Sequence, residues 1–529
     1  MIKNKIKKII EKAIKELQKE GVFPEFKIPD IKIEDTPKEI IEDYSSNVAM
    51  LIVKIIKKNP LEIANIINKK FEEGSLSGFG KIISKVEKPG FINFSIPSDY
   101  LRDKVGVVLK EKDKYGNLNI GKGKKIQIEF ISANPTGPLT IGNARGGPLG
   151  DVLANVFKKA GFKTEKEYYV NDYGNQILVL GHSVLKDDEA QYKGAYIDEL
   201  SEEIEEKDPF KAGELASKKI IEMIKKTVSN MGIKYDKWFS EKKLHNGDIN
   251  KIINFLKKKD FTYEKDGALW FKSSSLGDIR DRVLIKSNGK TTYLAGDIAY
   301  HYDKFKKRKF DKVINVWGAD HYGDVPGLKA GVEAIGYKGK LDIILLQFIT
   351  LYKGKEKLKM SKRAGTYVTM DELLDEVGRD VVRFFFLQRS ADKHLNFDLF
   401  LAKQQSEKNP VYYVQYAHAR MCGILRKSGK NISNCDFSKL KHSSELGLIK
   451  HLIHFPEIIE ETIKDYQVQR IPQYAIDLAK SFNGFYRDCQ VVTEKDESIR
   501  KARIALILAS RIVLKNCLGL AGVEAPEKM

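Results

Sequence analysis

The sequence predicts a multidomain α/β protein, with a nucleotide-binding α/β domain between a small N-terminal α+β domain and a C-terminal all-α helical bundle. The length of 529 residues is enough for about three domains at ~100–200 residues each. After residue 125, a strand, a glycine-rich turn, a helix and a second strand follow one another, the order typical of a doubly wound sheet. From about residue 409 onward, helical spacing of apolar residues replaces the strand pattern. We therefore expect domains at 1–120, 121–400 and 401–529.

The composition excludes several classes of protein. Since 42% of the residues are apolar and 31% are charged, the chain can build folded cores and is neither disordered nor collagen-like. The cysteines form no C-x-x-C pair, which argues against a zinc site or a disulfide scaffold: Cys422, Cys435, Cys489 and Cys517. No segment reads as a membrane span or a signal peptide, so we expect a cytoplasmic protein without membrane contact. The net charge of +20 favours a nucleic-acid partner, although biased lysine usage is an alternative source of that charge.

The first 120 residues predict a small α+β domain. Apolar residues recur on one face of an opening helix, at Ile2, Ile6, Ile9, Ile10, Ile14 and Leu17. A second helical stretch is expected over 47–71. Alternating residues at 81–86 and 91–94 flank Pro89-Gly90, which predicts a β-hairpin.

The central domain begins after a linker of glycine and lysine at 121–125. A strand is expected at 126–131, a helix at 139–159 and a second strand at 167–170. Further strands at 282–285 and 312–316, each followed by a helical stretch, are expected to extend the same α/β pattern. The acidic stretch 198–225 predicts an inserted helical hairpin. Beyond residue 409 we expect a bundle of helices over 411–425, 446–463, 471–485 and 499–518.

The first candidate phosphate-binding element is the segment 132–145, where a strand feeds a glycine turn and a helix start. Gly137 and Gly142 allow the backbone to approach a polyphosphate. Thr140 and Asn143 lie three residues apart on the first helical turn and can donate hydrogen bonds to phosphate oxygens. Read alone, the same residues fit an ordinary helix N-cap that binds no ligand.

The second element is the loop 357–365, which holds four cations within seven residues. Lys359, Met360, Ser361 and Lys362 form its centre. Such a loop can close over a triphosphate and offset the charge that develops on departing pyrophosphate. The alternative interpretation is a solvated basic loop.

Together these two elements resemble the HIGH and KMSKS motifs of class I aminoacyl-tRNA synthetases. The surrounding segments are similar to the arginyl-tRNA synthetase family in its bacterial form, at 45–49, 90–94, 129–138, 169–176, 266–270, 318–321 and 409–420. The resemblance extends over essentially the whole chain. It implies a Rossmann-like class I catalytic domain, an N-terminal domain that contacts the corner of tRNA and a C-terminal domain that reads the anticodon.

The resemblance also implies a reaction. Arginine would be activated with ATP to arginyl-adenylate and pyrophosphate, and the arginyl group would pass to the 3′-terminal ribose of tRNA(Arg). Mg²⁺ would accompany ATP, held mainly by the phosphates, so no set of metal ligands is expected in the protein. A monomer is the default expectation.

Family resemblance assigns the following roles. For arginine they are Ser132 and Asn134 at the amino-acid end, Glu241 and Asp297 at the guanidinium, Tyr293 along the pocket, and Asp320 and His321 near it. Two carboxylates suit a planar, always charged guanidinium, since a fork-shaped donor favours bidentate acceptors. Tyr416 and Arg420 are the expected tRNA contacts in the C-terminal domain.

One departure from the family concerns the HIGH element, where Thr140 replaces the first histidine and Asn143 the second. A hydroxyl can still donate one hydrogen bond, so we expect an enzyme slower by roughly 10- to 100-fold. The complete Lys359–Lys362 loop would compensate for this weaker element. Two alternatives stay open: a synthetase for another amino acid, and a tRNA-binding paralogue with weakened or lost catalysis.

Overall fold

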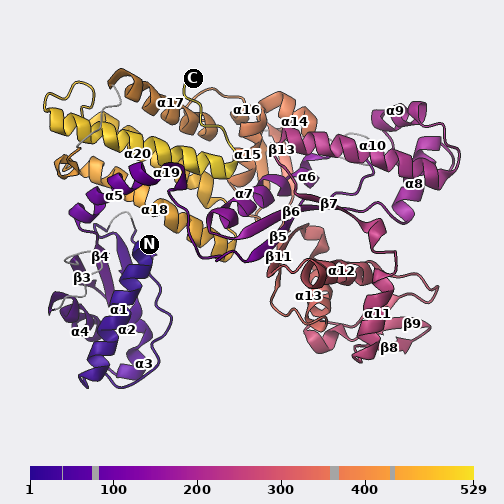
Figure 1. Cartoon of the computed structure of the whole chain (residues 1–529), viewed down its shortest axis with the longest axis horizontal. Helices are drawn as coiled ribbons and strands as arrows, with labels where there is room; N and C mark the ends of the chain where they lie inside the picture. Colours follow the sequence, from indigo (N-terminus) through magenta and orange to yellow (C-terminus); the bar gives the residue numbers. More distant parts are fainter. Residues whose placement is uncertain (38–39, 74–82, 355, 358–368, 429–434) are drawn as a thin grey trace.

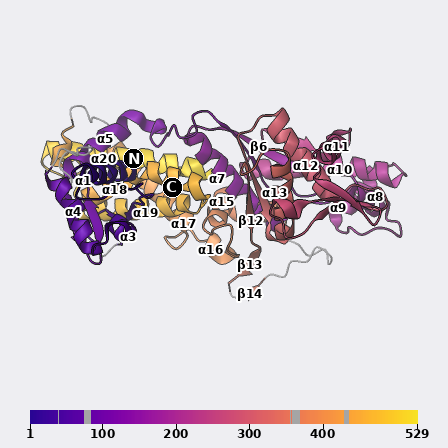
Figure 2. The ribbon, with the colours of Figure 1, turned by 90° about the horizontal axis from the view of Figure 1, so that it is seen from below.

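The structure is a computed structural model that describes residues 1–37, 40–73, 83–354, 356–357, 369–428 and 435–529. Figure 1 shows an elongated molecule with the N-terminal domain at one end and the central parallel sheet near the middle. Seen from below in Figure 2, the C-terminal bundle lies between that sheet and the N-terminal domain. The predicted sequence of α+β, α/β and all-helical parts is confirmed.

The N-terminal domain packs helices against a four-stranded sheet of order β1-β2-β4-β3. Its elements are α1 (Ile2–Lys19), β1 (Glu34–Asp35), β2 (Tyr44–Ser46), α2 (Val48–Leu51), α3 (Val53–Ile56), α4 (Pro60–Glu73), β3 (Ile83–Glu87) and β4 (Phe91–Ser95). The six predicted apolar residues of α1 are all buried, and β3 pairs antiparallel with β4, so both predictions are confirmed.

The single helix expected over 47–71 is wrong, because three separate helices occupy this stretch. Ile52 leaves the helical backbone region, and Lys57 takes a left-handed conformation with φ of 57°. Pro60 then starts α4, and proline disfavours helical backbone at the residue before it. Apolar spacing alone does not reveal such breaks.

The central sheet has five parallel strands in the order β12-β11-β5-β6-β7, which confirms the doubly wound prediction. The strands are β5 (Lys125–Glu129), β6 (Lys163–Val170), β7 (Lys237–Ser240), β11 (Lys312–Gly318) and β12 (Leu341–Leu346). The helix expected over 139–159 is divided at Arg145 into α6 (Ile141–Ala144) and α7 (Gly146–Lys159). Helix α7 lies so close to the sheet that a Cβ at Gly150 would be 2.2 Å from the ring of Phe130.

The strand expected at 282–285 forms, but it does not belong to the parallel sheet. As β10 (Arg282–Ile285) it joins β9 (Ala268–Phe271) and β8 (Thr262–Lys265) in a separate antiparallel sheet. Only Leu284 of β10 is buried. A strand within a parallel sheet would be covered on both faces, whereas an antiparallel sheet can keep one face in water.

The predicted helical insertion is confirmed as helical, but its packing differs from the expected hairpin. Helix α10 (Pro209–Asn230) lies against α8 (Asn175–Leu185), with the short α9 (Ala195–Glu203) beside α8. A Cβ at Gly181 would lie 1.6 Å from the Pro209 carbonyl oxygen, and one at Gly213 would lie 1.9 Å from that of Ile177. Backbone contact between α8 and α10 therefore requires glycine at both positions.

The C-terminal bundle consists of the four expected helices. These are α17 (Pro410–Ser428), α18 (Ser443–Asp465), α19 (Arg470–Asp488) and α20 (Glu497–Ala521), and α5 (Ser98–Glu111) packs on α18 and α20. Contrary to the reading that no segment resembles a membrane span, α20 is long and apolar enough to cross a membrane. However, 72% of its most apolar window is buried inside the protein, as expected for the core helix of a bundle.

The remaining elements complete the central part of the chain. The helices are α11 (Asp248–Lys258), α12 (Tyr293–Tyr302), α13 (Val325–Ala334), α14 (Met370–Val377), α15 (Arg379–Leu387) and α16 (Leu399–Ala402). The strands β13 (Ile349–Lys353), β14 (Glu356–Lys357) and β15 (Leu395–Asp398) form a fourth sheet among the described residues. Short 3₁₀ turns lie at Lys112–Lys114, Glu241–Lys243, Ser273–Leu276, Ala319–Asp324 and Phe437–Lys439, and a π-helical segment at Asp303–Lys307 follows α12.

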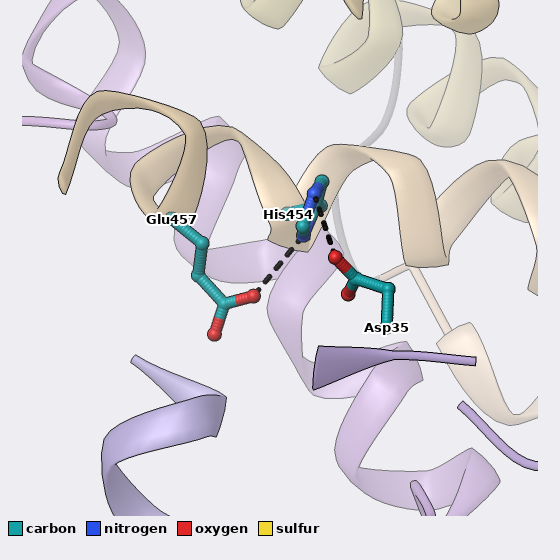
Figure 3. Close-up of side chains that lie close together, drawn as sticks. All are labelled: Asp35, His454 and Glu457. Atoms are coloured by element: carbon teal, nitrogen blue, oxygen red, sulfur yellow. Dashed lines mark hydrogen bonds and ion pairs between the residues drawn. The ribbon is translucent and has the colours of Figure 1, made fainter. Parts of the chain in front are cut away.

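A charged cluster joins the N-terminal domain to the bundle, and we call Lys3, Asp35, Tyr44, His454 and Glu457 the interdomain cluster. In Figure 3 the His454 ring lies between the two carboxylates, with Nδ1 3.1 Å from Glu457 Oε2 and Nε2 3.9 Å from Asp35 Oδ2. Lys3 donates from its backbone nitrogen to Glu457 and from Nζ to Asp35, at 2.9 and 2.8 Å. The Tyr44 hydroxyl donates to Glu457 Oε2 at 3.1 Å.

Candidate active site

A cavity of about 640 Å³ opens at the carboxyl ends of the parallel strands, and we call it the acidic pocket. This is the edge at which open α/β sheets bind their ligands. Among the residues that line it are six predicted for arginine: Ser132, Asn134, Glu241, Tyr293, Asp297 and His321. The structure thus brings together side chains that lie up to 189 positions apart in the sequence.

The segment that follows β5 has an unusual backbone. Ile131 and Ser132 both take left-handed conformations, with φ of 66° and 43°. Such values are costly for residues other than glycine and concentrate at functional sites. The turn allows the Ser132 hydroxyl to donate to Glu129 Oε1 at 3.2 Å and to accept from the Tyr169 backbone nitrogen at 3.0 Å. These two hydrogen bonds help to hold the strained end of β5 in one shape beside the pocket.

Two carboxyl groups of the acidic pocket have strongly shifted pKa values. Burial raises the pKa of Glu241 to about 7, and a hydrogen bond with Tyr169 only partly opposes this. Burial, followed by the nearby charges of Glu129 and Glu241, raises the pKa of Asp297 to about 7. Like charges that face one cavity disfavour ionisation until a cation arrives. The acidic pocket is therefore suited to a positively charged ligand.

Helix α12 carries two of the predicted pocket residues. Tyr293 is its first residue and is 80% exposed at the pocket, and Asp297 follows one turn later. His321 lies on the 3₁₀ turn after β11, with Nδ1 3.4 Å from Asp324 Oδ2. Asp320 is not among the residues that line the cavity, and its carboxylate lies 3.8 Å from His321 Nε2.

A second cavity of about 640 Å³ adjoins the first, and we call it the polar pocket. Its lining includes Gly137, Thr140 and Asn143 of the first phosphate-binding element, and Lys193 from the segment between α8 and α9. Asn134 lines both cavities. Gly142, in α6, is exposed and is not among the lining residues. A ligand in the polar pocket would thus meet a ligand in the acidic pocket at Asn134.

The side chain of Thr140 forms the N-cap of α6. Its hydroxyl accepts from the Asn143 backbone nitrogen at 3.2 Å and donates to Asn143 Oδ1 at 2.6 Å. Thr140 and Asn143 therefore share one face, as predicted. Because α6 has only four residues, its dipole adds little, and the donors of this element must come from side chains and individual amides.

The centre of the second phosphate-binding element, with Lys359, Met360, Ser361 and Lys362, lies outside the described residues. The described part of the same chain region ends with β14, where Lys357 pairs with Tyr352 of β13. The predictions for those four residues stay predictions.

Sequence reasoning assigned no role to several residues of the acidic pocket. Glu129, His301 and Asn315 all line it, and all three are buried. Glu129 is the last residue of a strand in which apolar and polar residues alternate. A charged residue is rarely buried unless it has a partner. The location of Glu129 at the end of this strand is the one feature of the sequence that points to a role in the site.

The described residues contain one group with the composition of a metal site, and it is the interdomain cluster. Ligand atoms of Asp35, His454 and Glu457 lie within 4.8 Å of one another. The Lys3 ammonium already lies 2.8 Å from Asp35 Oδ2 and supplies the positive charge there. A second cation would be repelled at that place, so we interpret the cluster as a contact between domains.

The expected tRNA contacts lie on α17. Tyr416 is 45% exposed and stacks on Tyr412, with ring centroids 6.2 Å apart. The Arg420 guanidinium lies 4.7 Å from the centroid of the Tyr486 ring. By contrast, the Tyr413 hydroxyl accepts a hydrogen bond from Asn483, which ties it to the neighbouring helix α19.

A third cavity, of about 660 Å³, lies in the N-terminal domain. Phe91, Lys85, Asn47 and Asn93 are among its lining residues. Asn93 is buried, and neither of its amide atoms has a hydrogen-bond partner within the described structure; the same holds for Asn47 Oδ1. Unsatisfied buried amides next to an aromatic ring and a lysine are suited to a planar polar ligand beside a phosphate.

Comparisons with known proteins agree across the chain. The family described as arginyl tRNA synthetase N terminal domain matches residues 4–96, tRNA synthetases class I (R), catalytic domain, matches 104–206 and 199–398, and DALR anticodon binding domain matches 414–529. The arginine–tRNA ligase of Caldanaerobacter subterraneus subsp. tengcongensis is 43% identical over 100% of this chain and 99% of its own length. That of Bacillus subtilis is 42% identical, with 100% of both chains covered. In fold, the chain is similar to Thermus thermophilus arginyl-tRNA synthetase, with a TM-score of 0.83, 22% identity and full coverage of both.

Proposed function

This chain belongs to the arginyl-tRNA synthetase family, and we propose from that premise that its acidic pocket binds arginine and its polar pocket binds ATP. The chain is an arginine–tRNA ligase, an enzyme of protein biosynthesis. Full-length relatives at about 42% identity support this activity over that of a lapsed tRNA-binding paralogue. We propose the functional units 1–120, 121–400 and 401–529, with α5 as the part of the first unit that packs on the third.

The observation that carries the arginine assignment is the pair of carboxyl groups in the acidic pocket. Glu241 and Asp297 face one cavity, and burial is the main cause that raises the pKa of each to about 7. A guanidinium is always charged, and its planar fork matches two carboxylates. Arginine would supply the missing positive charge and bring both groups to their ionised form.

The relation between the two pockets supports the chemistry. In the activation step the arginine carboxylate attacks the α-phosphorus of ATP, and pyrophosphate leaves. This step needs positioning and charge neutralisation more than it needs a general base. Asn134 borders both cavities, so an amino-acid carboxylate near Asn134 lies where it can reach a phosphate in the polar pocket. Ser132, with its fixed backbone, supports the same end of the substrate.

Mg²⁺ is proposed to enter with ATP. The polar pocket is lined by amide, hydroxyl, tyrosine and lysine side chains, and no carboxylate is present among the described lining residues. Magnesium prefers oxygen ligands and commonly keeps several waters while it binds phosphates. The ion would therefore be held by the phosphates of ATP.

For tRNA(Arg), we propose contacts on the C-terminal bundle and on the N-terminal domain. Tyr416 and Arg420 would face unpaired bases from α17, with Tyr416 offering an exposed ring for stacking. The N-terminal cavity would receive a base at the corner of the tRNA, since Asn93 offers an unsatisfied amide beside Phe91. We propose that the protein acts as a monomer in the cytoplasm.

The decisive test is ATP–pyrophosphate exchange with each of the twenty amino acids, with and without tRNA. We expect exchange with arginine alone, and its dependence on tRNA would show whether activation needs the bound nucleic acid. Exchange with a different amino acid would overturn the arginine assignment. No exchange under any condition would leave only tRNA binding.

The substitution Thr140→His tests whether the first phosphate-binding element is weakened in this chain. The Thr140 hydroxyl already donates to Asn143 Oδ1, and a histidine in its place gives up that bond but offers an imidazole N–H to the triphosphate. We expect the exchange rate to rise by about 10- to 100-fold, equivalent to about 1.4–2.7 kcal/mol of barrier. An unchanged rate in steady-state exchange would show that position 140 does not limit the reaction.

A further inference from the structure

A fully buried ion pair lies directly behind the wall of the acidic pocket. The Lys304 side chain has no solvent exposure, and its Nζ donates to Glu129 Oε2 at 2.6 Å and to Asn315 Oδ1 at 3.2 Å. Lys304 belongs to the π-helical segment Asp303–Lys307, an unusual geometry that is often found at functional sites. Glu129 and Asn315 line the pocket, whereas Lys304 does not.

The network continues to helix α12 through a histidine of defined protonation. His301 Nδ1 lies 2.7 Å from the Asp297 carbonyl oxygen, which can only accept, so Nδ1 carries the proton. Nε2 then accepts from Asn315 Nδ2 at 3.0 Å. Burial lowers the pKa of His301 well below its usual range, which agrees with a neutral ring. The same amide orientation places Asn315 Oδ1 toward Lys304, so every hydrogen bond has a donor and an acceptor.

A second buried ion pair lies nearby and provides a comparison. Arg308 binds Glu167, whose side chain has no exposure, and also binds Glu165. Tyr300 lies between the two pairs, because its hydroxyl donates to Glu167 and its ring lies 4.1 Å from Lys304 Nζ. The Arg308 side chain is 14% exposed, and neither Arg308 nor Glu167 lines the acidic pocket.

We propose that Lys304 is a positioning residue of the ligase reaction, which holds Glu129 as a fixed negative wall of the arginine pocket and ties it to α12. The proposal rests on the proposed function of that pocket. Glu241 and Asp297 become ionised when a cation binds in the pocket, whereas Glu129 already forms an ion pair with Lys304 inside the protein. Through Asn315 and His301, the same ammonium group sets the place of the helix that carries Asp297.

The physical reason is the cost of an unpaired buried charge. Without Lys304, Glu129 would be left ionised and unpaired, or it would take up a proton and lose its orientation. Arginine has two cationic groups, the guanidinium and the α-ammonium. In either case one of them would lose Glu129 as its negatively charged partner in the pocket. The effect would fall on arginine and not on ATP, because Glu129 lines the acidic pocket alone.

The test is a double-mutant cycle with Lys304→Met, Glu129→Gln and the combined variant, measured by arginine-dependent ATP–pyrophosphate exchange. For Lys304→Met we expect the KM for arginine to rise by about 10- to 100-fold, with the KM for ATP within about threefold. In the Glu129→Gln background, Lys304→Met should add no further rise in the KM for arginine. Lys304→Met alone should also show a steeper increase of kcat/KM with pH, because the unpaired Glu129 then ionises only at higher pH.

The matched control is Arg308→Met combined with Glu167→Gln, which removes the neighbouring buried pair. We expect this variant to lose thermal stability but to keep the arginine KM within about threefold. If Lys304→Met fails to fold, the combined variant Lys304→Met, Glu129→Gln is used in its place, because it leaves no unpaired charge. Its KM for arginine is then compared with that of Glu129→Gln alone.

Two outcomes would overturn the proposal. In one, Lys304→Met raises the arginine KM equally in both backgrounds; in the other, the Arg308 control raises it by the same factor. Absence of arginine-dependent exchange in the unmodified protein is a different result, since that would remove the proposed function itself.

Discussion

The acidic pocket and the interdomain cluster use the same kinds of side chain and reach opposite electrostatic states. In the cluster, burial would raise the pKa of Glu457, but the bonds from His454 and the Lys3 amide hold it below its usual range. Burial likewise opposes the charged form of His454, yet Glu457 and Asp35 raise its pKa. In the pocket, burial prevails, and the pKa values of Glu241 and Asp297 rise to about 7.

This difference shows that the function of a buried carboxylate depends on whether its cationic partner belongs to the protein or to a ligand. Where the protein supplies its own cation, as Lys3 does, the carboxylates join two domains. Where the positive charge is expected from a ligand, as for Glu241 and Asp297, the carboxyl groups have raised pKa values until that ligand binds. Four variants or conditions test this contrast, from the largest expected effect to the smallest.

Asp297→Asn should abolish most arginine recognition. The amide keeps the size of the side chain but removes one ionic partner of the guanidinium inside a buried site, which costs about 2–5 kcal/mol. We expect kcat/KM for arginine to fall by about 1000-fold in aminoacylation, with the KM for ATP nearly unchanged. A loss below tenfold would mean that Asp297 does not meet the guanidinium.

Glu457→Gln should weaken the attachment of the N-terminal domain. The carboxylate receives hydrogen bonds from the Lys3 backbone, Tyr44 and His454, so its removal leaves buried partners unsatisfied at a cost of about 2–4 kcal/mol. Calorimetry should show a lower first unfolding transition. Glu497→Gln, which removes a surface ion pair with Lys501 on the bundle, is the control and should leave this transition nearly unchanged.

Arginine affinity should increase with pH across neutrality. Both pocket carboxyl groups have pKa values near 7 before arginine binds, and the guanidinium requires their ionised forms. If both groups must lose a proton, the Kd for arginine should fall by about 100-fold between pH 6 and pH 8. Titration calorimetry in buffers of different ionisation enthalpy would detect the released protons. A Kd independent of pH would contradict the idea of an unpaired pocket.

A rise in pH should have the opposite effect on the interdomain cluster: it should weaken the contact between the two domains. Because the pKa of His454 is raised in the folded protein, its stabilising charge is fully present below the unfolded pKa of about 6.5 and is lost as pH rises through the folded value. We expect the stability difference between the unmodified protein and His454→Gln to be largest at pH 6 and to shrink as the pH rises to 9. If the stability of the two proteins depended on pH in the same way, the charge of His454 would not contribute to this contact.

Sequence patterns predict the helices of this fold well where one face is apolar, as in α1 and α17 to α20. They fail where a local backbone event interrupts the pattern, as at Ile52 and Lys57. The strand at 282–285 is predicted, but its sheet is not, because pairing depends on residues that are distant in the chain.

The same limit applies to the site. Family resemblance places Glu241, Asp297 and Asn134 at the pockets, and the structure brings them there. It gives no role to Lys304, since its partner Glu129 lies 175 residues earlier in the chain and neither residue stands out by spacing. Buried pairs of this kind become visible only when the strands and helices are in place.

The contact between α8 and α10 has a consequence for how this chain tolerates mutation. At Gly181 and Gly213 even an alanine methyl would overlap with backbone atoms of the facing helix, which have no rotamer through which to move away. Gly447 and Gly484, inside α18 and α19, have open space around the same position, and alanine there favours the helix by about 1 kcal/mol. A saturation-mutagenesis map would therefore separate these four glycines into two that accept no replacement and two that improve with one.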